Sequence, residues 1–379
     1  MNVRLPQVED FSDRLRGPET TSRVGVMLGI AFGVCFLTGV WSHLQQDTPA
    51  WLAIPPSPGG LYRVTQGVHI ITGTAAIPLL LIKLWSVFPK LFERPPRRIS
   101  RELVVHGLER VSIGVLVASA IFQLVSGALN IVQWYPWEYS FRRTHYAIAW
   151  IAIGALLVHI AVKIPIIRAA LSRPLPEEPA DDHLSRRGLL LTAGAAAGVT
   201  VLLTAGQTVP WLRRVSLFAV RSGDGPQGLP VNRTARAAGA LPEAEDPTFQ
   251  LELVFRKQSM FLDRAALEAL PQTTVDLPIA CVEGWSAGAT WTGVRMRDVA
   301  ELVGAPAKSR MFVTSMQTRG AFATSELPSQ FVNDERTLLA LRLNGERLSV
   351  DHGYPCRVIA PNRPGVLQTK WVKKLEMFG

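Results

Sequence analysis

Four histidines lie in or at the ends of long apolar stretches of the sequence: His69, His106, His145 and His159. An unpartnered ring nitrogen is costly in hydrocarbon, so a histidine in such a stretch requires a ligand or a hydrogen bond. His145 and His159 are 14 residues apart, which on one helix brings both to within about 40° of the same face and separates them by roughly 21 Å along its axis. This spacing suits two metal-holding groups stacked across a membrane.

The spacing favours two haem b groups, each held by histidines from two helices. His69 is expected level with His145, and His106 nearer the level of His159, so the expected pairs are His69 with His145 and His106 with His159. His43 lies near the same membrane face as His69 and is an alternative ligand. A single haem also remains open, because His106 lies beside charged residues where it can be hydrated. Histidines that only cap helix ends are the alternative to both haems.

The three cysteines, Cys35, Cys281 and Cys356, do not form the pattern of a disulfide framework. Cys281 opens the segment CVEGWS, and three further motifs follow it in order. They are WTGVRMRDVAELVG at 291–304, LALRLNGERLSVDHGYPCRVIAP at 339–361 and TKWVKKLEM at 369–377. Taken alone, a cysteine is more often a small buried residue than a ligand. Because four motifs follow one another in order, we interpret Cys281 as a ligand and not as an ordinary buried residue.

These motifs resemble the molybdopterin-binding domain of the sulfite oxidase family. In that family the cysteine that opens the first motif is the only protein ligand to molybdenum, which is otherwise held by the pterin dithiolene. The matching residue here is Cys281. A soft thiolate suits a high-valent metal that accepts two electrons and an oxygen atom. The resemblance therefore implies a molybdenum-cofactor oxidoreductase with Cys281 as its catalytic metal ligand.

The pterin of this cofactor carries a phosphate and many hydrogen-bonding edges, so its pocket requires basic and amide side chains. By their positions in the matched motifs, His352, Arg357 and Lys370 are expected to bind it. Asn232 and Arg233, in the segment PVNRTAR, are further candidates. For all five residues the alternative is an ordinary role at the protein surface.

The sequence departs from sulfite oxidases proper just after the ligand cysteine. Those enzymes place arginines there to hold the sulfite dianion, whereas Gly284, Trp285 and Ser286 follow here. The segment CVEGWS is closer to that of the bacterial periplasmic protein-methionine-sulfoxide reductase catalytic subunit. Cys356 stands where the family usually has an aliphatic residue, and we expect it in a strand core. The resemblance implies reduction of sulfoxides or N-oxides, with oxidation of sulfite or a related small molecule as the alternative.

The elements that carry these residues divide into a membrane half and a water-soluble half. Apolar residues make up 48% of the 379 residues, and they concentrate between Val24 and Pro210. Five stretches approach the ~20 residues needed to span hydrocarbon. They are Arg23–Trp41, Thr65–Phe88, Val104–Trp134, His145–Leu171 and Gly188–Val209. The first four resemble the di-haem b-type cytochrome subunits of quinone-linked oxidoreductases, which implies the quinone pool as electron partner.

The distribution of arginine predicts the orientation in the membrane. Residues 42–62 contain no arginine, whereas the segments before the first span and between the second and third are rich in it. These arginines are Arg4, Arg14, Arg16, Arg23, Arg94, Arg97, Arg98 and Arg101. We therefore expect a cytoplasmic N-terminus, and five crossings then deliver everything after Trp211 to the extracytoplasmic side. The aromatic residues at 134–139 are expected to form a belt at that outer face.

Residues 185–190 read SRRGLL and precede the apolar stretch TAGAAAGVTVLLTAG. The segment resembles a twin-arginine signal, the address for domains that are exported already folded. A cofactor inserted in the cytoplasm must be buried before it crosses the membrane, so such a signal fits a molybdenum domain. The alternative is a chance pair of cytoplasmic arginines. No small-residue cleavage site is obvious before Pro210, so we expect the stretch to remain as an anchor.

The C-terminal half alternates short apolar runs such as FQLELVF with turn-rich segments, which predicts strands. Short helices are expected at Asp263–Leu270 and Arg297–Val303. The expected fold is an N-terminal all-α transmembrane bundle of five helices plus a C-terminal α+β, mainly β, sulfite-oxidase-like domain. We expect a four-helix cytochrome b-like domain at 1–180, a signal anchor with the fifth helix at 181–215, and an extracytoplasmic molybdopterin-binding domain at 216–379.

The formal charge of +10 does not indicate nucleic acid, because Lys and Arg cluster beside apolar runs where phospholipid headgroups are the simpler partner. We expect a membrane-bound enzyme that passes electrons between the quinone pool, haem b and a molybdenum centre, acting on a small-molecule or protein sulfoxide. One rival is a cofactor-free extracytoplasmic binding module on a membrane anchor. Another is a molybdenum enzyme whose bundle is a plain anchor and whose electrons come from a soluble partner.

Overall fold

The structure, a computed structural model, describes residues 14–93, 101–175, 184–219 and 225–379. Contacts divide the chain into two compact units, which are described separately. The first contains Met1–Val40, Val68–Ala205 and Val215–Phe218, and the second contains Trp41–Gly67, Gly206–Arg214 and Ala219–Gly379. The second unit therefore includes Trp41–Gly67, which lies between the first two predicted spans. From the sequence, this segment is expected in the domain at 1–180.

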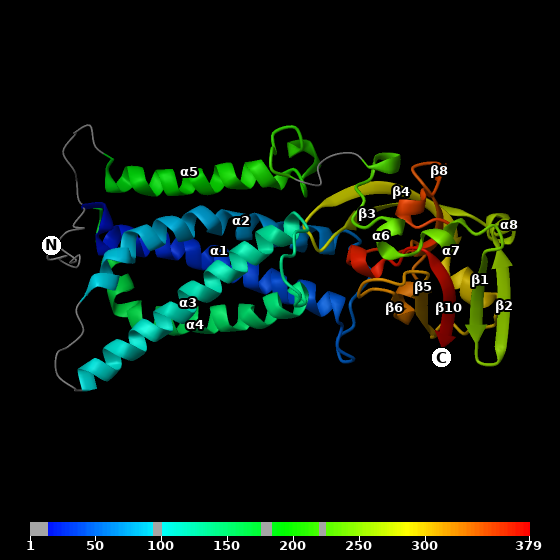
Figure 1. The fold of residues 1–379 in the computed structure, drawn as a ribbon, viewed down its shortest axis with the longest axis horizontal. Helices are drawn as coiled ribbons and strands as arrows, with labels where there is room; N and C mark the ends of the chain where they lie inside the picture. The colour runs from blue at the N-terminus through cyan, green and yellow to red at the C-terminus, as the bar shows by residue number, and fades with distance from the viewer. Residues whose placement is uncertain (1–13, 94–100, 176–183, 220–224) are drawn as a thin grey trace. The chain divides into compact units, whose positions relative to one another are not determined.

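Five long helices run through the N-terminal half (Figure 1). They are α1 (Pro18–Gln46), α2 (Leu61–Val87), α3 (Arg101–Ile131), α4 (Phe141–Leu171) and α5 (Arg186–Ala205). All five are long and apolar enough to cross a membrane, so the predicted spans are confirmed and the chain is a multi-pass membrane protein. α5 ends before the predicted Val209, and Gln207 and Thr208 beyond it are buried in the second unit.

Small side chains form the centre of the first unit. Ala31 of α1, Ala76 and Leu79 of α2, and Ala193 of α5 are buried against one another. Small residues let membrane helices approach closely, which replaces the hydrophobic driving force that lipid does not provide. Large apolar side chains such as Leu81 point outward and are exposed, as suits a surface facing acyl chains. Of the arginines that predict the orientation, Arg4, Arg94, Arg97 and Arg98 lie outside the described residues.

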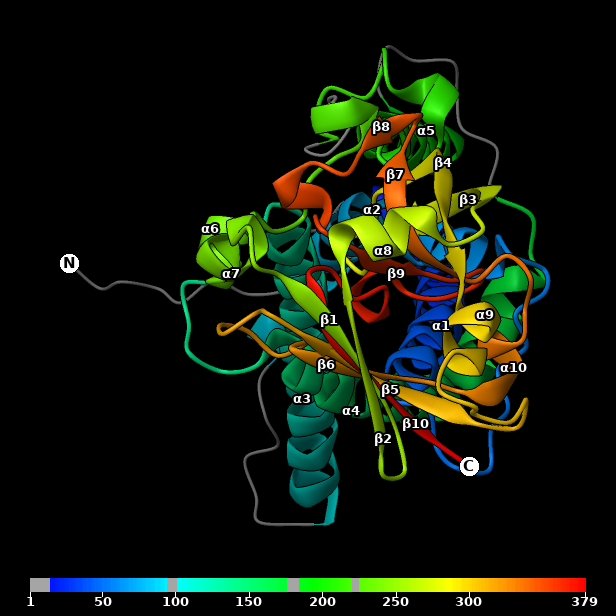
Figure 2. The same ribbon diagram turned by 90° about the vertical axis from the view of Figure 1, so that its right-hand side faces the viewer.

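The second unit contains two five-stranded sheets. The first has the order β2-β1-β10-β5-β6, with β1 and β10 parallel and the other pairs antiparallel (Figure 2). Its strands are β1 (Gln250–Phe255), β2 (Gln258–Asp263), β5 (Arg310–Ser315), β6 (Thr324–Leu327) and β10 (Val372–Phe378). The alternation in β1 buries Leu251, Leu253 and Phe255 on one face, as the run FQLELVF predicts.

The second sheet has the order β3-β4-β7-β8, and β9 also pairs with β7. Its strands are β3 (Thr273–Ala280), β4 (Ser286–Arg295), β7 (Leu338–Leu343), β8 (Glu346–Arg347) and β9 (Arg357–Ile359). β3 and β4 form an antiparallel hairpin whose register runs from Thr273 opposite Gly293 to Ala280 opposite Ser286. The hairpin therefore ends in a five-residue turn, Cys281 to Trp285, that begins with the predicted ligand.

Short helices connect the strands. They are α6 (Ala235–Ala238), α7 (Leu241–Glu245), α8 (Arg264–Ala269), α9 (Met296–Glu301) and α10 (Ser329–Val332), with 3-10 turns η5 (Pro226–Gly228), η6 (Val350–His352) and η7 (Gly365–Leu367). α8 and α9 lie where the sequence predicts helices, and the Asp263 side chain caps α8 by accepting a hydrogen bond from Ala266 N at 2.8 Å. Cys356 is fully buried in the core. The predicted fold class is confirmed.

The close approach of β4 and β7 generates a prediction about Gly293. A Cβ at this position would lie 2.1 Å from the carbonyl oxygen of Leu339, and the register of the two strands shifts at the same point. We expect Gly293→Ala to destabilise the second unit by about 2–3 kcal/mol, because backbone rather than a flexible side chain must move. Gly288→Ala on the same strand, with nothing within 4 Å, is the control. Equal melting temperatures of the two full-length variants would contradict this.

Candidate functional site

The turn at the end of the β3–β4 hairpin fixes Cys281. The Cys281 amide donates to the Trp285 carbonyl at 2.9 Å, and the Gly284 amide donates to the Cys281 carbonyl at 3.1 Å. Gly284 has a φ of 99°, a conformation that L side chains rarely adopt, so glycine is required for this turn. Cys281 itself is only 1% exposed. The sequence CVEGWS thus folds into a tight loop that holds one thiol in a fixed, buried position.

Two buried glutamines outside the matched motifs contact this turn. Gln66, at the start of α2, donates from Nε2 to the Val282 carbonyl at 3.1 Å. Gln207, just after α5, donates from Nε2 to the Glu283 carbonyl at 3.1 Å, and its own carbonyl accepts from the Ser286 amide at 2.9 Å. Neither residue stands out in the sequence, since both fall in predicted spans. The one available signal was a polar amide within an apolar stretch.

Electrostatics keep the Cys281 thiol protonated until a cation replaces the proton. Burial raises the pKa of Cys281 well above its ordinary value, and the nearby Glu283 raises it further, while Lys370 acts in the opposite direction. A buried thiol of this kind is inert toward solvent. Metal binding removes the proton because the metal supplies the positive charge that the surroundings lack. The site is therefore suited to a metal ligand and not to a free thiolate nucleophile.

Lys370 links its own segment to two others near Cys281, one at Asn232 and Arg233 and one at Asp351. Its Nζ donates to Asn232 Oδ1 at 3.1 Å, to the Arg233 carbonyl at 2.6 Å and to the Asp351 carbonyl at 2.9 Å. Burial, together with Arg357, lowers the pKa of Lys370 to about 7. The predicted residues Asn232, Arg233 and Lys370 therefore do lie together. An anion placed beside this amine would raise its pKa again and keep it charged.

Arg357 is a buried cation whose hydrogen-bond partners among the described residues are neutral. It is 2% exposed, and it donates to the carbonyls of His352 at 3.0 Å and Gln368 at 3.1 Å while its guanidinium lies over the Trp291 ring. Burial lowers the pKa of Arg357 to about 9, so the side chain is still charged at neutral pH. Burying a charge without a counter-ion is expensive. The arrangement favours an anionic ligand at this point.

His352 lies next to Arg357 and is held neutral. Its Nε2 lies 2.8 Å from the Pro226 carbonyl, to which it donates. Burial, followed by the charge of Arg357, lowers the pKa of His352 to about 4. The three predicted residues of the last two motifs, His352, Arg357 and Lys370, are thus brought together by η6, β9 and the bend that precedes β10.

Several buried polar atoms around this cluster have no hydrogen-bond partner among the described residues. They are Nε of Arg233, Nε of Arg357, Nε of Arg363 and Oε1 of Gln368. Buried groups of this kind are normally satisfied, so each indicates a missing partner. Three guanidinium nitrogens and one amide oxygen together suit a ligand that is anionic and also carries hydrogen-bond donors. Arg363 and Gln368 were not predicted, although both lie in the loop between the last two motifs.

The histidines of the first unit are oriented by hydrogen bonds from neighbouring helices. His69 Nδ1 lies 2.8 Å from the Cys35 carbonyl of α1, and His145 Nδ1 lies 2.9 Å from Ser126 Oγ of α3. His69 and His145 also interact electrostatically. A hydrogen bond at one ring nitrogen fixes the direction of the other, as metal-ligating histidines usually require. In both rings the nitrogen so held is Nδ1, and His69 Nε2 lies 4.0 Å from Cys35 Sγ of the same helix α1.

The other predicted pair has a different environment. His106 Nε2 accepts a hydrogen bond from Arg110 Nε at 2.9 Å, which leaves Nδ1 as the nitrogen available to a metal. His159 is half-buried and interacts electrostatically with Lys83 and Lys163. Within the described ranges, no group of three or more His, Cys, Asp or Glu side chains could hold a metal ion. A haem held by two histidines, or a molybdenum held by one cysteine and a pterin, has fewer than three such protein ligands.

Comparison with known proteins shows the family to which the chain belongs. Residues 238–378 match the family described as "Oxidoreductase molybdopterin binding domain". The uncharacterized oxidoreductase YuiH of Bacillus subtilis is 30% identical over 141 residues, which cover 36% of this chain and 70% of YuiH. The chain belongs to the sulfite oxidase family of molybdopterin-binding oxidoreductases. It is thus a molybdenum-dependent oxidoreductase, as its motifs predict.

Two other members of the sulfite oxidase family match shorter parts of their own chains. Sulfite oxidase of Arabidopsis thaliana is 34% identical over 113 residues, covering 25% of this chain and 29% of the plant enzyme. A putative protein-methionine-sulfoxide reductase subunit YedZ1 of Azospira oryzae is 29% identical over 136 residues, covering 35% of this chain and 50% of the subunit. The chain thus spans half or less of the length of these two relatives.

The buried charge of Arg357 predicts the effect of its removal on cofactor content. Arg357→Gln should lower the molybdopterin content of the full-length protein by about tenfold or more, because a charge-assisted hydrogen bond is worth roughly 1.5–3 kcal/mol. Arg347→Gln is the control, since Arg347 on the same sheet is exposed and pairs with Glu268 at 2.9 Å. The measurement is pterin released per chain. Equal pterin in both variants would show that Arg357 does not hold the cofactor.

The neutral state of His352 predicts a pH dependence of stability. Its pKa is lowered from 6.5 to about 4, so between these values the unfolded chain takes up a proton that the folded one does not. The free energy of unfolding should therefore rise with pH across this window, with a slope of at most about 1.4 kcal/mol per pH unit. Full-length protein and His352→Gln are compared by thermal unfolding from pH 4 to 7. A stability difference that stays constant over the window would refute the assignment.

Proposed function

We propose that this enzyme takes electrons from the quinone pool, passes them through haem b in the membrane bundle, and uses them at molybdenum to reduce a sulfoxide or N-oxide. The proposal rests on one observation above all: the hydrogen-bonded turn that carries Cys281 buries an acidic side chain, Glu283, directly before Gly284, Trp285 and Ser286, which stand where sulfite oxidases proper have anion-binding arginines.

The molybdenum site is proposed at Cys281, with the pterin held by the surrounding cluster. Arg357, Lys370 and Arg233 supply positive charge for the phosphate, and Asn232 and His352 supply polar edges. The bound cofactor provides two-electron oxygen-atom transfer. The chain's own contribution is to fix the sulfur, exclude water from it and compensate the charge of the ligand. A cofactor-free binding module would leave the buried Arg357 with only neutral hydrogen-bond partners among the described residues.

The substrate class follows from charge at the turn. The Glu283 carboxyl is 7% exposed and accepts a hydrogen bond from Trp285 Nε1 at 3.1 Å. An acidic group here disfavours a dianion such as sulfite, whereas a neutral sulfoxide carries no charge to repel. The reaction consumes two electrons and two protons, breaks the sulfur–oxygen bond and releases water and a thioether. The relative in Azospira oryzae, a putative protein-methionine-sulfoxide reductase subunit, supports this direction.

The haem ligands are proposed as His69 with His145 and His106 with His159. The first pair is better supported, because each ring is oriented by a hydrogen bond through Nδ1 and the two interact electrostatically. His106 would need to bind through Nδ1, since its Nε2 accepts from Arg110. Two haems in sequence across the membrane would carry single electrons between a quinol and the molybdenum site.

The proposed orientation places the N-terminus in the cytoplasm and the second unit outside it. The two arginines of SRRGLL open α5, and the Ser185 hydroxyl caps that helix by accepting from the Gly188 amide at 2.9 Å. A twin-arginine address at this point would export the second unit with its cofactor already buried. The apolar length of α5 is enough to leave it as an anchor.

Substrate assays on the purified full-length protein test the direction of the reaction. With a reduced dye as electron donor, methionine sulfoxide should be turned over, while sulfite with an oxidised dye should react at least about tenfold more slowly, since repulsion from Glu283 costs an estimated 1.4 kcal/mol or more. Glu283→Gln should narrow that gap. Faster reaction with sulfite would instead favour the alternative, a dehydrogenase that delivers electrons to quinone.

Haem content after single substitutions tests the ligand pairs. His69→Ala and His145→Ala should remove the same part of the reduced-haem absorption band, because each deletes one of two ligands to one iron. His43→Ala is the control and should leave that band unchanged. If the band is lost in His43→Ala but not in His69→Ala, then His43 and not His69 is the haem ligand. No haem in the unmodified protein would leave the bundle as a plain anchor.

A further inference from the structure

The turn that carries Cys281 is held by residues from outside the molybdopterin domain. Gln66 and Gln207 donate to consecutive carbonyls, those of Val282 and Glu283, each at 3.1 Å. Gln66 is 4% exposed and Gln207 is 2% exposed. All of these residues belong to the second unit, although Gln66 lies at the start of α2 and Gln207 follows the end of α5.

These two bonds fix the peptide planes that follow the cysteine. Val282 and Glu283 follow Cys281 in this five-residue turn. The direction of the Cys281 side chain therefore depends on the orientation of the peptide planes that Val282 and Glu283 form with their neighbours. The next residue is fixed as well, because the Ser286 amide donates to the Gln207 carbonyl at 2.9 Å and its hydroxyl donates to the Thr208 carbonyl at 3.1 Å. Rotation of the turn would break at least one buried hydrogen bond, which costs about 1–3 kcal/mol.

We propose that Gln66 and Gln207 are positioning residues for Cys281, so that one residue near the start of α2 and one just after α5 set the direction of the sulfur and thereby tune the metal it binds. The inference rests on the proposed role of Cys281 as molybdenum ligand. It adds that the molybdopterin domain does not form this ligand geometry alone. Groups beyond the ligands commonly tune a metal's potential by orienting them.

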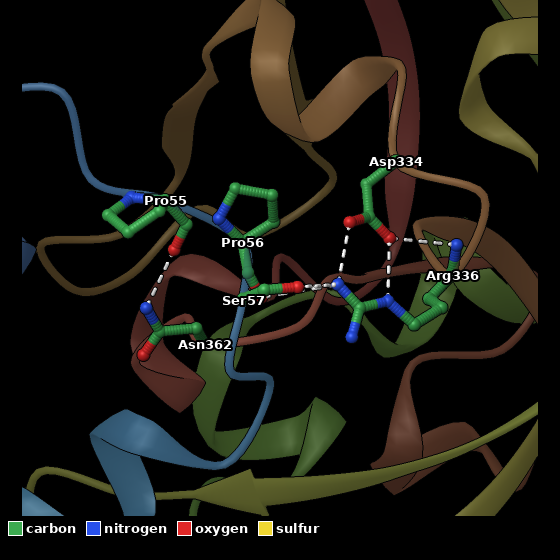
Figure 3. A network of polar contacts seen from close by, with 6 residues as sticks. All are labelled: Pro55, Pro56, Ser57, Asp334, Arg336 and Asn362. Carbon is green, nitrogen blue, oxygen red and sulfur yellow. Dashed lines mark hydrogen bonds and ion pairs between the residues drawn. The ribbon is translucent and has the colours of Figure 1, made fainter.

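Anchoring of the segment Trp41–Gly67 does not require Gln66. Asn362 alone makes three bonds to it, from its amide to the Gly59 carbonyl at 2.8 Å, from Nδ2 to the Pro55 carbonyl at 2.7 Å, and from the Tyr62 amide to Oδ1 at 2.9 Å. Arg336, paired with Asp334, adds a bond to Ser57 Oγ at 2.8 Å (Figure 3). The glutamines therefore have a role other than anchoring this segment, namely their hydrogen bonds to the turn that carries Cys281.

A second observation points the same way. Oε1 of Gln66 and Oε1 of Gln207 are buried and have no hydrogen-bond partner among the described residues. Neither amide can turn over to satisfy its oxygen, because Nε2 must face the carbonyl of the turn. Each unsatisfied oxygen costs about 1–3 kcal/mol, which an apolar side chain of similar size would avoid. Two such costs beside one turn indicate that the donated bonds have a function beyond packing.

The test uses full-length protein in which Gln66 or Gln207 is replaced by methionine, which keeps the length of the side chain but removes the donor. The matched control is Gln330→Met, because Gln330 makes the same kind of bond between the same parts of the chain, from Nε2 to the Ile54 carbonyl at 3.2 Å, away from Cys281. Molybdenum content, the midpoint potential of the molybdenum and its Mo(V) resonance are measured in each.

We expect both glutamine variants to shift the potential and the Mo(V) resonance outside the range of the control. Values equal to the control at full metal content in both variants would overturn the proposal. If methionine unfolds the chain, Gln66→Glu and Gln207→Glu answer the same question, since each keeps the size and polarity of the side chain but exchanges the donor for an acceptor.

A second readout needs no metal. In cofactor-free protein, alkylation of Cys281 requires local opening of the turn, so its rate reports the population of open turn. Loss of one bond should raise that rate by roughly three- to tenfold while alkylation of buried Cys356 stays unchanged. An unchanged rate at Cys281 would contradict the positioning role. Absence of molybdenum from the unmodified protein would refute the proposed function instead, and this second readout would still decide the role of the glutamines.

Discussion

Positive charge that is hydrogen-bonded only to neutral groups, beside one buried thiol, is the constraint on which the second unit depends. Arg357 and Lys370 are hydrogen-bonded to neutral oxygens, and the pKa of each is lowered by burial. An isolated apo domain would be more stable with apolar residues in their place. The cost is offset only when an anion occupies the cluster, and molybdopterin, with its phosphate and dithiolene, is the anion that the family supplies. Occupation of the cluster by the proposed cofactor would therefore stabilise the folded unit.

The catalytic unit extends into what the sequence presents as the membrane half. Trp41–Gly67 and Gly206–Arg214 belong to it by their contacts, and they reach it through Asn362, Arg336 and the turn after Cys281. The helices α1, α2 and α5 adjoin these segments in the sequence. The segments that contact the turn carrying Cys281 are therefore direct continuations of helices long enough to cross the membrane. Segments of the second unit that adjoin the membrane helices in the chain thus contribute buried hydrogen bonds to the turn that carries the thiol.

Much of the fold and part of the site could be predicted from the sequence, and the reasons are physical. Apolar length fixes the five spans, alternation fixes β1, and an acidic cap fixes α8, because each signal is local. The residues of the ordered motifs, His352, Arg357 and Lys370, also come together as predicted. Gln66 and Gln207 could not be found this way, because a glutamine in an apolar stretch carries no mark of the distant carbonyl it contacts. The end of α5 was misplaced for the same reason: Gln207 and Thr208 are buried by protein, and hydropathy does not distinguish protein from lipid.

The most direct test of the account is the sulfur coordination of the metal. X-ray absorption at the molybdenum edge should show that Cys281→Ser has one sulfur neighbour fewer than the unmodified full-length protein, while the pterin sulfurs remain. A sulfur shell that is identical in the two proteins, at equal molybdenum content, would contradict the assignment of Cys281 as the metal ligand and with it the site described above.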